Sequence, residues 1–252
     1  MSDPQTHRVL VPVDVRDGEE LSPAIVDAFA SISIVLLGYV SIPDQTGPEQ
    51  ARDRFGDAAR EELERHRGAF ADAGADVTTR LAFTRDRFET FERAAVELEC
   101  EAVLVVADAP RLDRFLVAVR GDVATDRIAG LLAAILAETE IRLTLFSAVA
   151  EGDRAEREAL LSELAASVEA GGVGPERIDR ELVEDDSPTD AIVEAAADHD
   201  LVVAGESRPS IRRLIFRDRT RRIARRTAVP TLVVRGQYLE PAGEGSESTR
   251  EG

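Results

Sequence analysis

Short apolar runs, rich in β-branched residues, alternate with longer amphipathic stretches along the chain. The apolar runs predict nine strands, at residues 9–13, 34–40, 77–81, 102–106, 115–119, 141–146, 178–182, 201–203 and 231–234. The amphipathic stretches predict helices at residues 23–32, 48–73, 88–99, 125–139, 154–170 and 188–199, and one in an arginine-rich stretch ending near residue 227. Near-continuous apolar strands that alternate with helices are typical of a parallel sheet covered on both faces. The pattern therefore predicts an α/β fold.

The pattern of the first half of the chain recurs in the second half. Residues 9–13 match residues 115–119, and residues 104–107 match residues 201–204. After residue 107 only a few residues precede the next strand, whereas residue 204 is followed by room for a loop, a helix and a strand. The first copy has therefore lost its last helix and strand, or it shares the strand beginning at Phe115 with the second copy.

This repetition predicts the organisation of the whole chain. We expect two Rossmann-like, parallel-sheet repeats, residues 1–112 and 113–236, packed as an internal pseudo-dimer; a homodimer of the whole chain stays open. The tail at residues 237–252 is rich in Gly, Ser and Glu, which predicts disorder.

Charge removes one class of function. The 252 residues carry a formal charge of -18, and every cationic side chain other than histidine is an arginine. Such an excess of carboxylates repels nucleic acids and anionic membranes, so we expect no nucleic-acid partner. Abundant carboxylates, arginine in place of lysine and the absence of Trp are typical of a cytosolic protein from a high-salt (halophilic) organism. Solubility alone is the alternative explanation.

The location of the protein is predicted from its cysteine content and its apolar segments. Cys100 is the single cysteine of the sequence, which excludes an internal disulfide and a cysteine-based metal cluster. The N-terminus has neither a basic nor an apolar leader region, and the longest apolar stretch, near residues 128–137, is too short to span a bilayer. We therefore expect a cytoplasmic protein that does not cross a membrane.

Three segments carry a resemblance to a known family. Residues 186–196 with 200–205, residues 223–235, and residues 9–14 resemble the third helix and fourth strand, the last helix and strand, and the first strand of universal stress proteins. The resemblance implies an adenine-nucleotide alpha-hydrolase-like fold, a role in stress response and, in some members, ATP binding. Units of this family also occur beside or fused to transporters, which implies a transporter as one class of partner.

The glycine-rich phosphate loop of nucleotide-binding members is largely missing here. Their pattern is Gly, two residues, Gly, nine residues, then Gly with Ser or Thr, which lets the backbone approach phosphate at a helix N-terminus. In this chain Gly205 keeps the first position, Arg208 replaces the second glycine, and Asp218 with Arg219 replaces the final pair, although Thr220 follows. The resemblance leaves a degenerate anion or nucleotide pocket in the second repeat as the candidate site. Its residues are Gly205, Ser207, Arg208, Thr220 and Arg120.

The first repeat lacks the phosphate-loop segment altogether. Asp108 takes the place of Gly205 in the match of the two repeats. Asp14 occupies a position that lines the nucleotide pocket in the family, but Arg120 stands there in the second repeat. A turn residue at the end of a strand is the alternative interpretation of Asp14, and we favour it.

The arginine-rich stretch has two interpretations. Residues 208–226 hold nine arginines and a single acidic residue, Asp218. Arginine forks bind phosphate and carboxylate, so an arginine-based anion site could replace the glycine-based one. The alternative, which we favour, is a solvated helix face or ion pairs with carboxylates of the other repeat.

Catalytic chemistry finds no support in the sequence. His7, His66 and His199 lie at a strand start, on an acidic helix and at a helix end, without metal or triad spacing, so surface or capping roles are expected. We therefore predict a non-enzymatic regulatory or stress-response protein without a cofactor, acting through an unidentified protein partner and binding ATP or another anion weakly if at all. An ATP-binding sensor and a soluble regulatory module of a membrane transporter are the alternatives.

Overall fold

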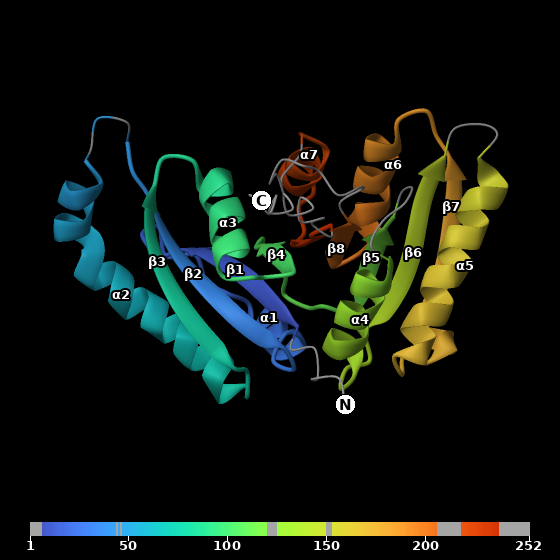
Figure 1. Ribbon diagram of the computed structural model, residues 1–252, viewed down its shortest axis with the longest axis horizontal. Helices are drawn as coiled ribbons and strands as arrows, with labels where there is room; N and C mark the ends of the chain where they lie inside the picture. The colour runs from blue at the N-terminus through green and yellow to red at the C-terminus, as the bar shows by residue number, and fades with distance from the viewer. Residues whose placement is uncertain are drawn as a thin grey trace, which may run out of the picture.

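Nine strands among the residues that the structure describes form one sheet, in the order β3-β2-β1-β4-β9-β8-β5-β6-β7 (Figure 1). The structure is a computed structural model that describes residues 7–43, 45, 47–119, 125–149, 153–205 and 218–236. The strands are β1 (Arg8–Asp14), β2 (Ser33–Ser41), β3 (Val77–Thr84), β4 (Ala102–Val105), β5 (Arg114–Ala118), β6 (Arg142–Val149), β7 (Ile178–Glu184), β8 (Leu201–Gly205) and β9 (Thr231–Val234).

Helices alternate with these strands and cover both faces of the sheet (Figure 1). They are α1 (Pro23–Ala28), α2 (Pro48–Asp72), α3 (Arg87–Glu97), α4 (Thr125–Leu136), α5 (Arg154–Ala170), α6 (Pro188–Ala195) and α7 (Asp218–Arg226), with short 3-10 turns at Pro175–Arg177 and Ala196–Asp198. Local chemistry fixes several helix starts. The Ser22 hydroxyl accepts a hydrogen bond from the Ile25 amide, and Asp86 accepts from the Phe88 and Glu89 amides. The predicted α/β fold is thus confirmed.

One strand pair makes the sheet mixed. All neighbouring strands run parallel except β4 and β9, which are antiparallel and pair Ala102 with Val234 and Val105 with Thr231. Strand β9 also pairs in parallel with β8. Because β9 joins β8 to β4, a single sheet runs through the whole chain.

The strand order reads alike from either end of the sheet. From one end it is β3-β2-β1-β4, and from the other it is β7-β6-β5-β8, with β9 between the two sets. Strand β5, which comes first along the chain in the second set, pairs with β6 and β8. The hypothesis that the first half shares this strand is therefore wrong, since the strand beside β4 is β9.

The hydrophobic core differs between the two faces of the sheet. On one face a single cluster includes buried residues from α1, α2, α4, α5 and strands of both halves, from Val9 to Val234. On the other face two clusters are separate. One joins α3 to β1, β2, β4 and Val233, and the other joins α6 and Ile223 of α7 to β5, β6 and β8. The first face therefore unites the halves, whereas the second face keeps them apart.

Polar contacts also cross between the halves. Arg235, which follows β9, donates from Nη1 to the carbonyl oxygens of Ala95 at 3.0 Å and Cys100 at 2.6 Å. The Ser31 hydroxyl of the first half also donates to the Ala134 carbonyl of the second half, at 2.8 Å. These bonds tie the end of β9 and the start of β2 to elements of the opposite half.

Candidate functional site

The strand order reverses at two positions in the sheet. They lie between β1 and β4 and between β5 and β8. In open α/β sheets ligands bind outside the carboxyl ends of the strands at such switch points. Gly205 is the last residue of β8 and pairs with Val234 of β9, so it lies at the second of these positions.

The predicted pocket is only partly within the described residues. Gly205 is half-buried at the end of β8, and Thr220 lies in the first turn of α7. Ser207, Arg208 and Arg120 fall outside the described residues, as does the Thr220 side chain. Whether these five side chains lie together therefore stays a prediction, and so does the predicted disorder of residues 237–252, which also fall outside.

The arginines of α7 have different partners. Arg226 forms an ion pair with Asp190 of α6, with a distance of 2.5 Å between Nη1 and Oδ1, and hydrogen bonds from Ser187 and Arg226 lower the pKa of Asp190. The neighbouring Arg225 instead stacks on the ring of Phe88 in the first half, with Cζ 5.3 Å from the ring centroid. The favoured interpretation was a solvated helix face or ion pairs with the other half, and Arg222, Arg225 and Arg226 are indeed exposed. Among the described residues, however, the ion pair of α7 stays within its own half, and the contact between halves is a cation–π contact.

In the first half, Asp14 is engaged by its own loop. Its Oδ1 accepts hydrogen bonds from the backbone amides of Arg16 at 3.0 Å and Asp17 at 3.3 Å. An aspartate that accepts from amides two and three residues later forms a local turn. The interpretation of Asp14 as a turn residue is confirmed.

A half-buried carboxyl group lies beside this turn. Glu19 Oε2 accepts the amide of Asp14 at 2.8 Å, and burial raises the pKa of Glu19 despite this bond. Tyr39, near the end of β2 and only 4% exposed, lies close to Glu19 and Arg87, and burial raises its pKa as well. At the end of β1 the Glu19 carboxylate thus bonds the backbone of Asp14, whose own carboxylate bonds its turn.

The register of the sheet corrects the correspondence between the halves at this edge. Val9 pairs with Ala102, and Phe115 pairs with Leu201. If Val9 corresponds to Phe115, then Ala102 corresponds to Leu201, and Gly205 has Val106 as its counterpart rather than Asp108. Only residues 106–113 connect β4 to β5, so the first half has no helix that corresponds to α7.

The histidines differ from expectation. Surface or capping roles were expected; His66 is 2% exposed and His199 is 7% exposed, so neither lies on the surface, but His199 is the C-cap of the 3-10 turn at Ala196–Asp198. His66 lies close to the backbone of Glu19 in the loop after β1, and burial lowers its pKa. His199 contacts the Thr144 hydroxyl at 2.9 Å and the Ala195 carbonyl at 2.7 Å. Within the described ranges, no group of three His, Cys, Asp or Glu residues could hold a metal ion.

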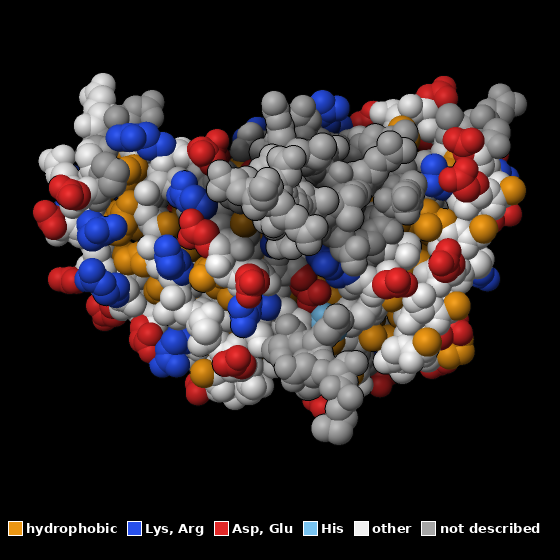
Figure 2. Space-filling model, in the orientation of Figure 1, with side chains coloured by type: hydrophobic (Ala, Val, Ile, Leu, Met, Phe, Trp, Pro, Cys, Tyr) orange, Lys and Arg blue, Asp and Glu red, His pale blue; other side chains and the backbone are white. Residues whose placement is uncertain are grey.

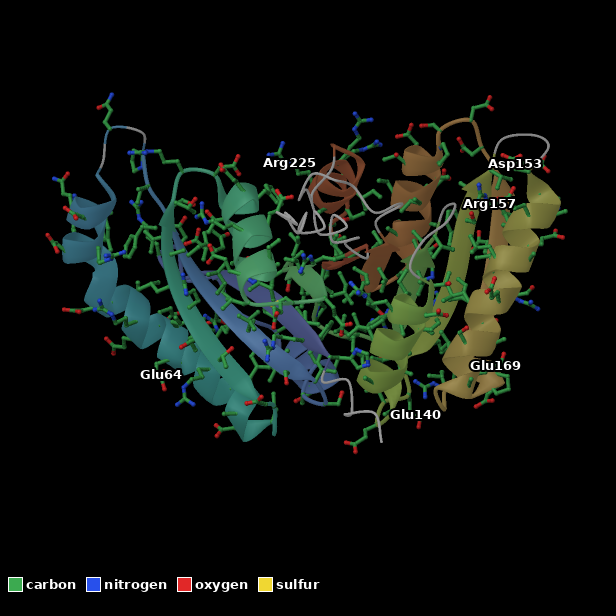
Figure 3. The ribbon with its side chains drawn as sticks, in the orientation of Figure 1. Glu64, Glu140, Asp153, Arg157, Glu169 and Arg225 are labelled. Carbon is green, nitrogen blue, oxygen red and sulfur yellow. The ribbon has the colours of Figure 1, made fainter. Side chains whose placement is uncertain are left out.

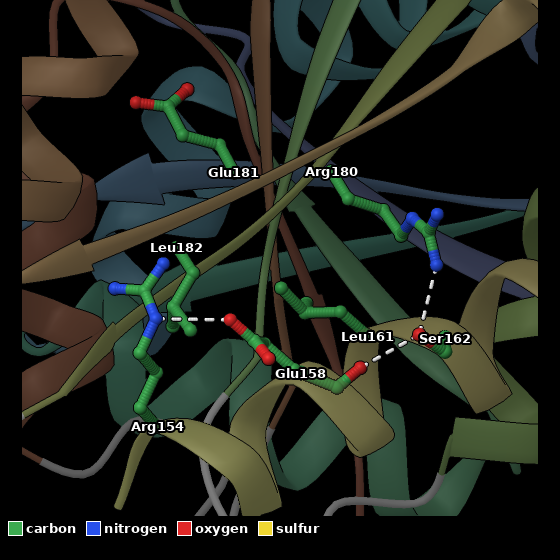
Figure 4. A pocket seen from close by; sticks show the side chains of 7 residues that line it. All are labelled: Arg154, Glu158, Leu161, Ser162, Arg180, Glu181 and Leu182. Carbon is green, nitrogen blue, oxygen red and sulfur yellow. Dashed lines mark hydrogen bonds and ion pairs between the residues drawn. The ribbon is translucent and has the colours of Figure 1, made fainter.

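A groove of about 560 Å³ lies elsewhere, between α5 and the edge strand β7 (Figure 4). Arg154 forms an ion pair with Glu158 there, and Arg180 donates to the Ser162 hydroxyl at 2.8 Å. Leu161 also lines the groove. Strands β5 and β6 separate β7 from β8, so this groove is distinct from the switch point at Gly205.

The side chains that sequence reasoning missed are Tyr39, Arg87 and Phe88. The adjacent Arg87 and Phe88 after the N-cap Asp86 are the one local signal for a stacked arginine. Nothing local links this pair to Arg225, since the contact depends on where α7 lies. Figure 3 shows Arg225 on the side of α7 that faces α3.

Comparison with known proteins identifies the class. Residues 111–235, about half of the chain, match the model of the universal stress protein family. A universal stress protein from Archaeoglobus fulgidus DSM 4304 has a similar fold, with a TM-score of 0.61 and 16% identity over 92% of this chain and 99% of that chain. No curated protein matches the chain.

Two further structures are less similar. A universal stress protein in complex with cAMP covers 52% of this chain and 100% of its own, at 25% identity and a TM-score of 0.40. The cytoplasmic domain of a prokaryotic cation chloride cotransporter covers 90% of this chain and 94% of its own, at 13% identity and a TM-score of 0.45. The family match supports the universal stress protein family for residues 111–235, and the Archaeoglobus structure shows a shared fold over most of both chains. Among the described residues no helix is both long enough and apolar enough to cross a membrane.

Proposed function

We propose that the chain is a non-enzymatic regulatory protein of the universal stress protein type, in which the nucleotide-binding loops of both halves are degenerate. The observation that carries the proposal is the state of the first switch point. Asp14 serves its own turn there, Glu19 accepts the Asp14 amide, and only residues 106–113 connect β4 to β5. A loop this short leaves no phosphate-binding segment in the first half.

The second half supports the same proposal through its sequence. Gly205 remains, but Arg208 and Asp218 replace the later glycines of the family pattern. A side chain in place of the second glycine crowds a backbone that must approach phosphate closely, and an aspartate repels phosphate. The chain then acts through its fold and a protein partner, and a transporter stays one class of that partner.

We further infer that the chain is an internal pseudo-dimer of two copies. The matching order of strands on either side of β9 supports this inference, as does a fold shared with the Archaeoglobus protein over most of both chains. In this arrangement β9 completes its own half and also supplies the strand that the first half lacks.

Calorimetry with MgATP tests the proposed function. We expect no micromolar binding, and no change when Gly205 is replaced by Asp. Micromolar affinity that Gly205→Asp abolishes would instead establish the ATP-sensor alternative, which the position of Gly205 at the second switch point favours.

A further inference from the structure

Two arginines from opposite halves of the chain stack on one aromatic ring. Phe88, in the first turn of α3, is 3% exposed. The Cζ atom of Arg87 lies 5.0 Å from its ring centroid, and that of Arg225, from α7, lies 5.3 Å from it. Both arginine side chains are themselves exposed. One ring of the first half is therefore contacted by an arginine from each half of the chain.

These two arginines lack the carboxylate partners that other arginines have. Within the described part of the chain no carboxylate lies within 4 Å of Arg87 or Arg225, whereas Arg226, on the same helix, pairs with Asp190. Asp86, next to Arg87, already accepts the amides of Phe88 and Glu89 with its Oδ1. The acidic and basic side chains are otherwise mixed over this face of the molecule (Figure 2).

Stacking prepares the two guanidinium groups for an anion. A guanidinium group that lies over a ring is held by its face, so its N–H donors point outward in the plane of the group. Two positive charges near one ring repel each other, and a bound anion would offset this repulsion.

The geometry points to a phosphate-binding site formed by Arg87 and Arg225 at the junction of α3 and α7. We propose that it takes one phosphate group of an oligophosphate. A single arginine fork satisfies both oxygens of a carboxylate, whereas a phosphate group has further oxygens that can accept from a second fork. This site does not depend on the proposed function, since neither the loop after Gly205 nor a nucleotide base takes part.

Such a site would also link the two halves on the face of the sheet where their cores are separate. Phe88 belongs to the cluster of the first half, and Ile223 of α7 belongs to that of the second. A phosphate group bound by both arginines would hold α7 against α3 and reinforce this contact.

Calorimetry with inorganic pyrophosphate at constant ionic strength tests the proposal. We expect saturable binding, and we expect Arg87→Gln and Arg225→Gln each to weaken it by about tenfold. The loss of affinity in the double variant should be no more than about twice the loss in either single variant, because both arginines act on one group. Arg226→Gln is the control, because Arg226 is on the same helix but is ion-paired with Asp190.

The outcomes separate this site from the other possibilities. Absence of saturable pyrophosphate binding, or an equal loss in Arg226→Gln, overturns the proposal. Inorganic phosphate, pyrophosphate and ATP are compared in the wild type, and ATP binding that is tighter than pyrophosphate but still lost in Arg225→Gln identifies a nucleotide as the source of the phosphate. If pyrophosphate binding is unchanged in Gly205→Asp, the proposal of this arginine site holds, even where micromolar ATP binding refutes the proposed function.

Discussion

The two faces of the sheet join the halves of the chain in different ways. On the face covered by α1, α2, α4 and α5, apolar side chains form one cluster that runs through both halves. On the face covered by α3, α6 and α7 the clusters are separate, and the described contact between α3 and α7 is the stacking of Arg225 on Phe88. A continuous apolar core is cooperative, whereas an exposed polar contact is weak and can respond to a ligand.

Strand β9 gives the most direct test of this difference between the faces, because its adjacent residues point to opposite faces of the sheet. Leu232 lies in the continuous cluster and Val233 in the cluster of α3, and both are fully buried. We expect Leu232→Ala to cost about 2–5 kcal/mol of unfolding free energy, the range for buried leucine truncations. Because its cluster spans both halves, hydrogen exchange measured by mass spectrometry should show lost protection in both.

Val233→Ala is the matched control. It should cost about 2 kcal/mol, for two methyl groups and the cavity they leave, with lost protection concentrated around α3. If Leu232→Ala and Val233→Ala lost hydrogen-exchange protection over the same parts of the chain, the difference between the faces would be contradicted.

Arg235 tests the polar ties between the halves. Its guanidinium is buried and donates to the carbonyls of Ala95 and Cys100 in the first half. Arg235→Met should lower the unfolding free energy by about 2–3 kcal/mol, because two buried carbonyl oxygens lose a charged donor. Chemical denaturation measures this loss, and Arg226→Met, which removes an exposed ion pair, should cost less than about 1 kcal/mol. Equal costs would show that the bonds of Arg235 add nothing to the junction.

His66 gives the smallest and most local effect. Burial lowers its pKa below the ordinary value of 6.5, so the native state binds a proton less readily than the unfolded chain. The stability it contributes is therefore present above pH 6.5 and is lost as the pH falls below that value. We expect His66→Gln to lower the melting temperature at pH 7.5 slightly, and to reduce the further drop between pH 7 and pH 5. A drop as large as that of the wild type would contradict this role.

The local pattern of the sequence was sufficient for the elements but not for every buried position. All nine predicted strands form, since runs such as residues 34–40 and 141–146 are apolar enough to be buried on both sides. His66 was placed on the surface because its neighbours in the helix are acidic. The backbone of Glu19 in the loop after β1 lies close to it, and that contact joins residues more than forty positions apart, which no local pattern records.

The residues of the candidate site likewise differ in whether the local sequence predicts them. Gly205 could be predicted from the strand before it and the family pattern after it, and it does lie at a switch point. Asp14 was correctly interpreted as a turn residue because the turn is local. The stacking of Arg87 and Arg225 on Phe88 could not be predicted, since it depends on the position of α7 relative to the other half.

The sequence by itself determined the alternation of strands and helices, the parallel character of most of the sheet and the family resemblance, because each depends on local periodicity and short motifs. Only the tertiary structure decided that β9 lies between β8 and β4. Both edges of β9 carry hydrogen-bonding groups that any strand could satisfy. The partner on each edge is selected by the burial of Leu232, Val233 and Val234 in clusters built from distant parts of the chain.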